Sequence, residues 1–385
     1  MAATCLTNKI ILDLGQLHPG PHTAMLLGQL GATVIKVERP HTGDTARALG
    51  AGTFAKYNRG KLSIALDLKD GHDRAILLRL ARRAHGLIEG FRPDTLERLG
   101  VGPDTLLRAN PALVVCAISG FGQTGPYAHR PGHDLNYLAL AGYWAVPSQI
   151  EEKVARPRLR LSDYCGSMYA ALSMVVAIMT AEKTGKGQHL DVSLQDAMLA
   201  WTWPGIDMMR RSPSREACDM PHIMPDNDLF ETADGAFIAL GILEPKFWDA
   251  LRSCLGGEYP ALCAPRFHNR DGRMRNKHSL HALLKAIFAE KTRRQWAQRF
   301  EGSDIPWAPL LDCDEVAQDV HFQARHPDVC ALPLHDAAAL GFPVRFSQGL
   351  PAQDMNAPEL DAHRGLILDW LEDMAQDVPR FRSDG

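Results

Sequence analysis

The sequence lacks any pair of cysteines at Cys-x-x-Cys spacing, although it contains eight cysteines. Zinc sites and disulfide oxidoreductases use that spacing, so we expect neither a zinc site nor a redox-active dithiol. We also expect no signal peptide, because no basic segment followed by a long apolar stretch opens the chain. Free thiols, a cytoplasmic location and no metal are therefore predicted.

Long apolar runs and an excess of one charge are absent as well. No uninterrupted apolar run reaches the roughly 18 residues of a membrane span. The formal net charge is -3, so we expect no nucleic-acid partner and no membrane partner. With 385 residues, of which 45% are hydrophobic, the chain has the composition of a globular protein of about two domains.

The first part of the chain alternates apolar strands with amphipathic helices. Strands are predicted over Lys9–Leu14, Ala32–Val37, Leu62–Leu68, Gly86–Phe91, Ala112–Ser119 and His189–Leu194, and helices over Pro21–Leu30 and Asp73–Ala84. This order is typical of an α/β fold with a parallel sheet and helices on both faces. Such sheets bind ligands beyond the carboxyl ends of their strands.

Composition divides the chain into a large domain and a small one. We predict the first part of the large domain over residues 1–203, ending after a buried apolar helix at Ser167–Glu182. Residues 204–228 are predicted to be a linker. Residues 229–325 are predicted to form a smaller α+β domain. Residues 326–385 are predicted to return and complete the large domain, with a helix near Leu366–Met374.

Two features point to a phosphate-bearing ligand without a redox cofactor. Gly120–Gly125 matches Gly-x-Gly-x-x-Gly, but Pro126 and a polar stretch follow where a dinucleotide site would open a helix. A glycine-rich loop beside a ligand is the favoured interpretation. Each basic residue near a strand end is, taken alone, more often a solvated surface charge. As a group at the strand ends, these residues are suited to binding a phosphate-bearing ligand. They are Arg39, Arg59, Lys61, Arg92 and Arg98.

A helix is predicted to begin near His133 and Asp134. Its first backbone N–H groups have no acceptor within the helix and can bind a developing oxyanion. His133 can move a proton near neutral pH. The structural alternative is that Asp134 caps the helix and His133 has no role in the chemistry.

Three further side chains are candidates for chemistry. Asp163 precedes the long apolar helix, where a carboxylate is either a helix cap or a base or nucleophile. Glu244 stands at a second helix start, before Pro245, with the same two interpretations. Cys165 is a weaker candidate nucleophile, because no basic partner is nearby in the sequence.

Seven segments, in this order, resemble the class III CoA-transferase family, which includes α-methylacyl-CoA racemase. The similarity runs from about Lys9 to Phe322. The segments are His18–His22, Val34–Pro40, Ile88–Pro93, Ser119–Pro126, Ser162–Asp163, Lys183–Gln188 and Thr232–Gly235.

The resemblance implies a Rossmann-like large domain, a small domain and an interlocked homodimer. It implies no metal and no prosthetic group, with coenzyme A (CoA) entering only as part of an acyl-CoA substrate. Arg39, Arg92 and Arg98 match positions near the CoA phosphates and adenine. Gly132 and Tyr137 are assigned to the same ligand site.

The family contains two chemistries, and Asp163 matches the key carboxylate of both. In the racemases it exchanges a proton opposite a histidine, which His133 matches, and a glutamate matched by Glu244 supports that histidine. This combination favours racemisation of 2-methyl-branched acyl-CoA. In the transferases the carboxylate carries the acyl group and then CoA covalently. Tyr164 stands where racemases have a glycine-rich run, and a tyrosine there can narrow the acyl site or alter the chemistry. Met220–Pro225 is closer to the transferase alternative.

Overall fold

The computed structural model describes residues 4–146, 150, 154–212, 223–330, 340–351 and 356–373. The chain forms two compact units. The large unit comprises Met1–Tyr143, Pro157–Trp201 and Ala331–Gly385, and the small unit comprises Trp144–Arg156 and Thr202–Cys330. The C-terminal segment is thus grouped with the large unit, and the short stretch 144–156 with the small unit, which no sequence pattern indicates.

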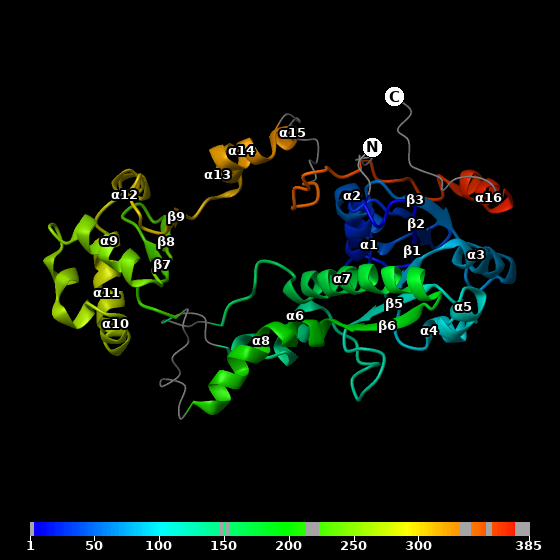
Figure 1. Ribbon diagram of the computed structural model, residues 1–385, viewed down its shortest axis with the longest axis horizontal. Helices are drawn as coiled ribbons and strands as arrows, with labels where there is room; N and C mark the ends of the chain where they lie inside the picture. Colours follow the sequence, from blue (N-terminus) through cyan, green and yellow to red (C-terminus); the bar gives the residue numbers. More distant parts are fainter. Residues whose placement is uncertain are drawn as a thin grey trace. The chain divides into compact units, whose positions relative to one another are not determined.

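The large unit contains a six-stranded parallel sheet in the order β3-β2-β1-β4-β5-β6 (Figure 1). The strands are β1 Ile10–Asp13, β2 Thr33–Glu38, β3 Leu62–Ala65, β4 Gly86–Glu89, β5 Val114–Ser119 and β6 Gln188–Ser193. Each lies within or beside a predicted strand, so the predicted α/β class with a parallel sheet is confirmed.

Helices cover both faces of this sheet. The helices of this part of the chain are α1 Gly20–Gln29, α2 Ala51–Asn58, α3 Gly71–Arg83, α4 Thr95–Arg98, α5 Pro103–Ala109, α6 Asp134–Leu140, α7 Leu161–Thr184, α8 Leu194–Arg211 and α16 Arg364–Glu372, with short 3-10 helices η1 Thr45–Leu49 and η2 Tyr143–Ala145. Of these, α8 and η2 continue from the large unit into the small one. Alternate side chains of β1 point to opposite faces of the sheet. Leu12 packs with α3 and α16, and Ile11 packs with α1 and α7.

Helix α7 is the longest element of the large unit. Among the described residues it is the one helix long and apolar enough to cross a membrane by length and composition, and half of its most apolar stretch is buried. Ala170, Met174 and Ile178 pack against the sheet. A half-buried helix of this kind is typical of a protein core. The opposite face of α7 exposes apolar side chains to solvent.

The predicted linker is partly wrong. Helix α8 continues through Pro204 to Arg211, because a proline within a helix can be accommodated rather than ending it. Residues 213–222 of the predicted linker, which include part of the Met220–Pro225 segment, lie outside the described residues.

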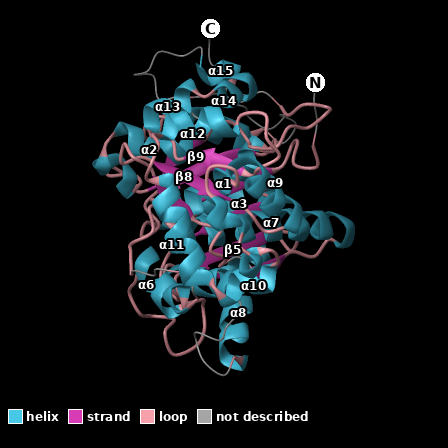
Figure 2. Cartoon of the chain, turned by 90° about the vertical axis from the view of Figure 1, so that its left-hand side faces the viewer, coloured by secondary structure: helices cyan, strands magenta, loops and turns pink. Residues whose placement is uncertain are grey.

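The small unit combines a three-stranded antiparallel sheet with helices. Strands β7 Leu229–Glu231, β8 Phe237–Leu240 and β9 Trp307–Pro309 lie side by side. Figure 2 distinguishes the strands of the chain from its helices and loops. The helices are α9 Pro245–Leu255, α10 Arg270–Arg275, α11 Lys277–Phe288, α12 Arg293–Phe300, α13 Cys313–Gln318, α14 Val320–Arg325 and α15 Pro327–Cys330, with 3-10 helices η3 Pro260–Cys263 and η4 Pro265–Phe267. The unit has its own core, which is rich in aromatic side chains. Its antiparallel sheet and helices agree with the predicted α+β composition.

Candidate active site

The strand order reverses between β1 and β4, and the loop after β1 begins the candidate site. At such a reversal the loops beyond the strands separate, and ligands bind there in α/β sheets. The loop leaves β1 after Asp13 and enters α1 at Gly20, and it carries His18.

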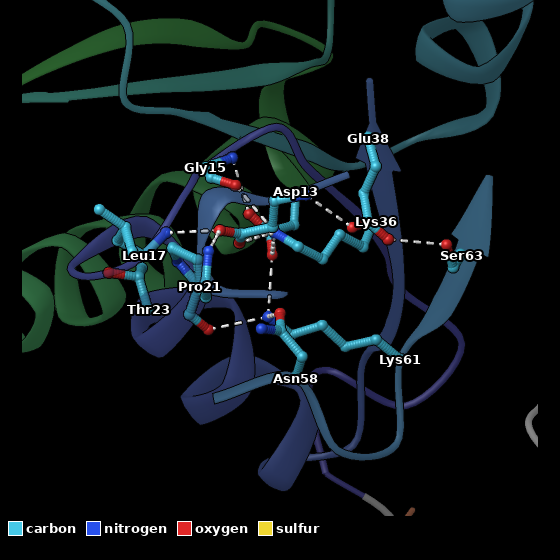
Figure 3. A network of polar contacts seen from close by, with 12 residues as sticks. Asp13, Gly15, Leu17, Pro21, Thr23, Lys36, Glu38, Asn58, Lys61 and Ser63 are labelled. Carbon is cyan, nitrogen blue, oxygen red and sulfur yellow. Dashed lines mark hydrogen bonds and ion pairs between the residues drawn. The ribbon is translucent and has the colours of Figure 1, made fainter. Parts of the chain in front are cut away.

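A buried network of charges fixes this loop (Figure 3). Lys36 donates to Gly15 O at 2.8 Å and Lys61 donates to Pro21 O at 2.9 Å. The two ammonium groups share Asp13, whose Oδ2 lies 3.3 Å from Lys36 and 2.8 Å from Lys61. Asp44 accepts from the Leu17 amide at 2.9 Å. The backbone on both sides of His18 is therefore tied to buried ions.

Lys61 does not stand at an exposed rim, contrary to prediction. Its side chain is 1% exposed, and its ammonium donates to Asp13, Asn58 and Pro21. Burial lowers the pKa of Lys61 to about 8, against the raising effect of Asp13. The prediction was wrong because Lys61 lies directly before β3, where it points inward to neutralise Asp13.

Asp163 lies in the first turn of α7, at its third residue, and not at the cap position. A carboxylate there is favoured by the positive end of the helix dipole. Its side chain is 10% exposed, and its Oδ2 lies 3.3 Å from Nδ1 of His18. Ser167 Oγ donates to the Asp163 carbonyl at 2.7 Å and contacts Pro19 O at 3.2 Å. Helix α7 and the loop after β1 thus meet at Asp163.

Asp134 caps α7, although it belongs to α6. Its Oδ1 accepts from Ser162 N at 2.8 Å, from Ser162 Oγ at 2.5 Å and, at 3.5 Å, from Asp163 N. The predicted alternative, that Asp134 caps its own helix, is wrong, since Asp134 is the first residue of α6 and His133 precedes it. The contact joins the N-termini of α6 and α7, so Asp134, which follows His133 in the chain, is tied to Ser162 and Asp163.

His133 is exposed, and its backbone N–H donates to Asn136 Oδ1 at 3.0 Å. Gly132 accepts the Tyr137 hydroxyl at 2.5 Å. A Cβ atom at Gly120 would lie 2.3 Å from the Tyr137 ring, so glycine is required there for packing. No helix opens after Gly125, and α6 begins only at Asp134. This agrees with a glycine-rich loop rather than a dinucleotide site.

Four rings pack together, and one of them, His18, lies beside the Asp163 carboxylate. We call them the four-ring cluster: His18, His22, Tyr57 and Tyr164. His18 lies 5.2 Å from His22, 4.6 Å from Tyr57 and 4.7 Å from Tyr164, measured between ring centroids. The two tyrosine hydroxyls are 2.8 Å apart. Sequence reasoning missed this cluster as a site. Its signal was the pair of histidines in His18–His22, which flanks Pro-Gly-Pro.

The other predicted residues are distributed as follows. Arg39, Arg92 and Arg98 are exposed after β2, β4 and within α4, and Arg59 is half-buried after α2. Glu244 is exposed at the start of α9 in the small unit, whereas His133 and Asp163 belong to the large unit.

Cys165 is unsuited to nucleophilic attack. Its thiol is buried and donates to Ala197 O at 3.1 Å. Burial raises the pKa of Cys165 to about 11, so little thiolate is present at neutral pH. Across the described residues, no group of three or more His, Cys, Asp or Glu side chains is arranged to hold a metal ion.

Comparison with known proteins assigns the family. The model described as CoA-transferase family III matches residues 6–364. The chain belongs to this family. Human α-methylacyl-CoA racemase is 33% identical over 319 residues, covering 82% of this chain and 80% of the racemase. Acetyl-CoA:oxalate CoA-transferase of Acetobacter aceti is also 33% identical, over 369 residues, covering 91% of this chain and 92% of the transferase.

Solved structures show the same fold. A CAIB/BAIF family protein from Brucella suis superimposes with a TM-score of 0.80 at 27% identity, covering 96% of this chain and all of that one. The family III assignment confirms the resemblance carried by the seven segments. It makes the chain an enzyme of the acyl-CoA transferase and racemase superfamily.

Proposed function

We propose that this family III enzyme inverts the α-carbon of 2-methyl-branched acyl-CoA thioesters by proton transfer. The observation that supports this most is the Asp134 contact, which brings His133 and Asp163 to adjacent helix N-termini. Inversion requires one group to remove a proton from one face and a second group to return a proton to the other. An imidazole and a carboxylate in one site meet that requirement.

The steps balance without a cofactor. In one direction neutral His133 takes the α-proton, and the C–H electron pair forms the C=C bond of an enolate while the thioester oxygen becomes negative. The N-terminal N–H groups of α6 donate to that oxygen. Protonated Asp163 then returns a proton to the opposite face of the α-carbon. In the reverse direction Asp163 is the base and the His133 imidazolium is the acid.

Two further assignments belong to this proposal. Arg39, Arg59, Arg92 and Arg98 bind the phosphates of CoA, because guanidinium groups pair bidentately with phosphate. Glu244 supports the imidazolium form of His133, a role that rests on the family resemblance. Replacing Glu244 with Gln then lowers kcat more than it raises KM, whereas replacing Arg92 with Gln chiefly raises KM.

We also propose a homodimer. Helix α7 exposes a stripe at helical spacing, with Met168 51%, Leu172 63%, Val176 57% and Met179 40% exposed. Contiguous apolar surface of this kind marks an interaction site. Sedimentation analysis of the wild type and of Leu172→Glu together with Val176→Glu tests this. A monomeric wild type contradicts the dimer, and a dissociated double variant supports it.

The deciding experiment is α-proton exchange in deuterated water, followed by NMR on each epimer of a 2-methylacyl-CoA. The wild type exchanges and inverts both epimers. Asp163→Asn and His133→Ala each retain a single base, so neither inverts the substrate. Each exchanges the α-proton of one epimer only, and the two variants act on opposite epimers. Asp104→Asn, at an exposed site on α5, behaves as wild type. Absence of exchange across branched acyl-CoA thioesters refutes the proposal.

The second candidate is CoA transfer between a thioester and a free acid. The observation favouring it is the Acetobacter transferase, equally similar over a larger share of the chain. Here Asp163 attacks the thioester carbonyl, and CoA leaves as a thiolate. The thiolate then attacks the Asp163 carbonyl of the mixed anhydride, which releases the donor acid and leaves CoA on Asp163 as a thioester. The incoming carboxylate displaces this CoA to form a second anhydride, and the thiolate attacks the acyl carbonyl of that anhydride to give the new acyl-CoA and free Asp163. Hydroxylamine added during turnover would trap an acylated Asp163, which mass spectrometry detects. A racemase gives no such adduct.

A further inference from the structure

The four-ring cluster contains buried ring nitrogens without a hydrogen-bond partner. They are Nδ1 and Nε2 of His18 and Nδ1 of His22. The His18 side chain is 3% exposed and His22 is 8% exposed. Nδ1 of His18 lies 3.3 Å from the Asp163 carboxylate without the alignment of a hydrogen bond. Buried polar atoms are normally paired, so unpaired ones beside a reacting carboxylate indicate a ligand that pairs with them.

His22 is uncharged at neutral pH. Burial, together with the positive charges of His18, Lys61 and Lys56, lowers the pKa of His22 to about 3. A neutral imidazole offers one N–H donor and one nitrogen acceptor. The bonded hydroxyls of Tyr57 and Tyr164 retain one further donor and several acceptor positions. His22 and the two tyrosines thus present donors and acceptors together.

We propose that the four-ring cluster recognises a hydroxyl group on the acyl chain, so that the preferred substrate is a hydroxylated 2-methyl-branched acyl-CoA. This inference rests on the proposed racemisation. A hydroxyl both donates and accepts, which matches the neutral His22 imidazole and the two tyrosine hydroxyls. A carboxylate only accepts, and it would add a second negative charge beside Asp163 in a buried setting. An alkyl chain would leave the ring nitrogens unpaired.

The partly exposed members of the cluster lie on the side from which a substrate arrives. Tyr57 and Tyr164 are half-buried, whereas both histidines are nearly covered. Tyr164 directly follows Asp163 in α7, and the Tyr57 ring lies 4.6 Å from the His18 ring between centroids. A hydroxyl close to the α-carbon held at Asp163 is therefore within the range of the cluster, whereas one at the far end of a long chain is not.

The test uses three 2-methyl-branched acyl-CoA thioesters of equal length, which carry hydrogen, a hydroxyl or a carboxylate at the next carbon. Wild-type kcat/KM for α-proton exchange is expected to be at least about tenfold higher with the hydroxylated thioester than with either other one. His22→Phe keeps the ring and removes its nitrogens, and it is expected to reduce this ratio to about threefold or less. His72→Phe, at an exposed site on α3, retains the ratio.

Tyr164→Phe removes one hydroxyl only and provides a second variant if His22→Phe fails to fold. A wild-type ratio near one, which a buried water bound to the rings would produce, overturns the inference, as does a preference for the alkyl or carboxylate thioester. A preference unchanged in both variants also overturns it. If no thioester exchanges its proton, the proposed racemisation fails, and calorimetric binding of the same three thioesters to wild type and His22→Phe decides this inference separately.

Discussion

Replacing Asp134 with Ala perturbs the contact on which the site depends. The Asp134 carboxylate is 8% exposed and caps α7 from α6 through Ser162, which is fully buried. The substitution removes the acceptor of the Ser162 amide and leaves the Ser162 hydroxyl only the longer contact to Asp134 O, at 3.3 Å. It also detaches the helix turn that carries Asp163 from the residue next to His133.

The magnitude follows from those bonds. Loss of a helix cap costs about 1 kcal/mol, and leaving the buried Ser162 groups without their acceptor adds about 1–3 kcal/mol. Asp134→Ala is therefore expected to lower the free energy of unfolding by about 2–4 kcal/mol. Asp134→Asn keeps an oxygen acceptor and loses mainly the attraction of the charge to the helix dipole, about 0.5–1 kcal/mol.

Urea unfolding measured by circular dichroism gives the global effect, and hydrogen–deuterium exchange over residues 161–170 gives the local one. Exchange there should accelerate in Asp134→Ala and change little in Asp134→Asn, with α-proton exchange falling in the same order. Asp104→Ala, an exposed aspartate in the first turn of α5, is the control. If Asp134→Ala costs no more than Asp134→Asn, the capping contact does not hold α7 as described.

Three other substitutions test separate parts of the structure. Burial raises the pKa of Glu89 to about 7, so the free energy of unfolding should be highest below the unfolded-state pKa and should fall as pH rises through 7. Glu89→Gln cannot ionise, so this fall between pH 5 and pH 8, measured by urea unfolding, should be smaller by about 2–3 kcal/mol. Lys61→Met leaves Asp13 with one cation and should cost about 3 kcal/mol, against almost none for exposed Lys56→Met. Cys165→Ala should retain α-proton exchange, and native protein should react with a thiol reagent at exposed Cys5, Cys263 and Cys313 but not at Cys165.

The parallel sheet was predictable because its signals are local. Apolar runs between turn residues mark strands such as those at Ile10 and Val114, and intervening amphipathic segments require crossover helices, which force parallel pairing. The linker was less predictable, because Pro204 breaks a pattern in the sequence without breaking the helix in the structure. The assignment of residues 144–156 to the small unit depends on tertiary contacts that no local pattern encodes.

Site residues were predictable only where the local sequence around a single residue indicates its role. Asp163 is a carboxylate at a helix start, and that follows from its neighbours in the chain. Its contact with His18 joins residues far apart in sequence, so no spacing indicates it. Lys61 was misassigned for the converse reason: a lysine beside a strand looks exposed until the buried carboxylate that requires it, Asp13, is known.

The two chemistries of the family make opposite demands on the same carboxylate. A nucleophile must stay unprotonated while it attacks, whereas an acid–base group must hold its proton through half of each cycle. Nδ1 of His18 lies 3.3 Å from Oδ2 of Asp163, so His18 is placed to affect whether that carboxylate holds a proton. If His18→Leu shifts the pH dependence of α-proton exchange without abolishing it, His18 tunes the proton held by Asp163. This outcome would favour racemisation, because an acyl-carrying Asp163 would have no proton for His18 to tune.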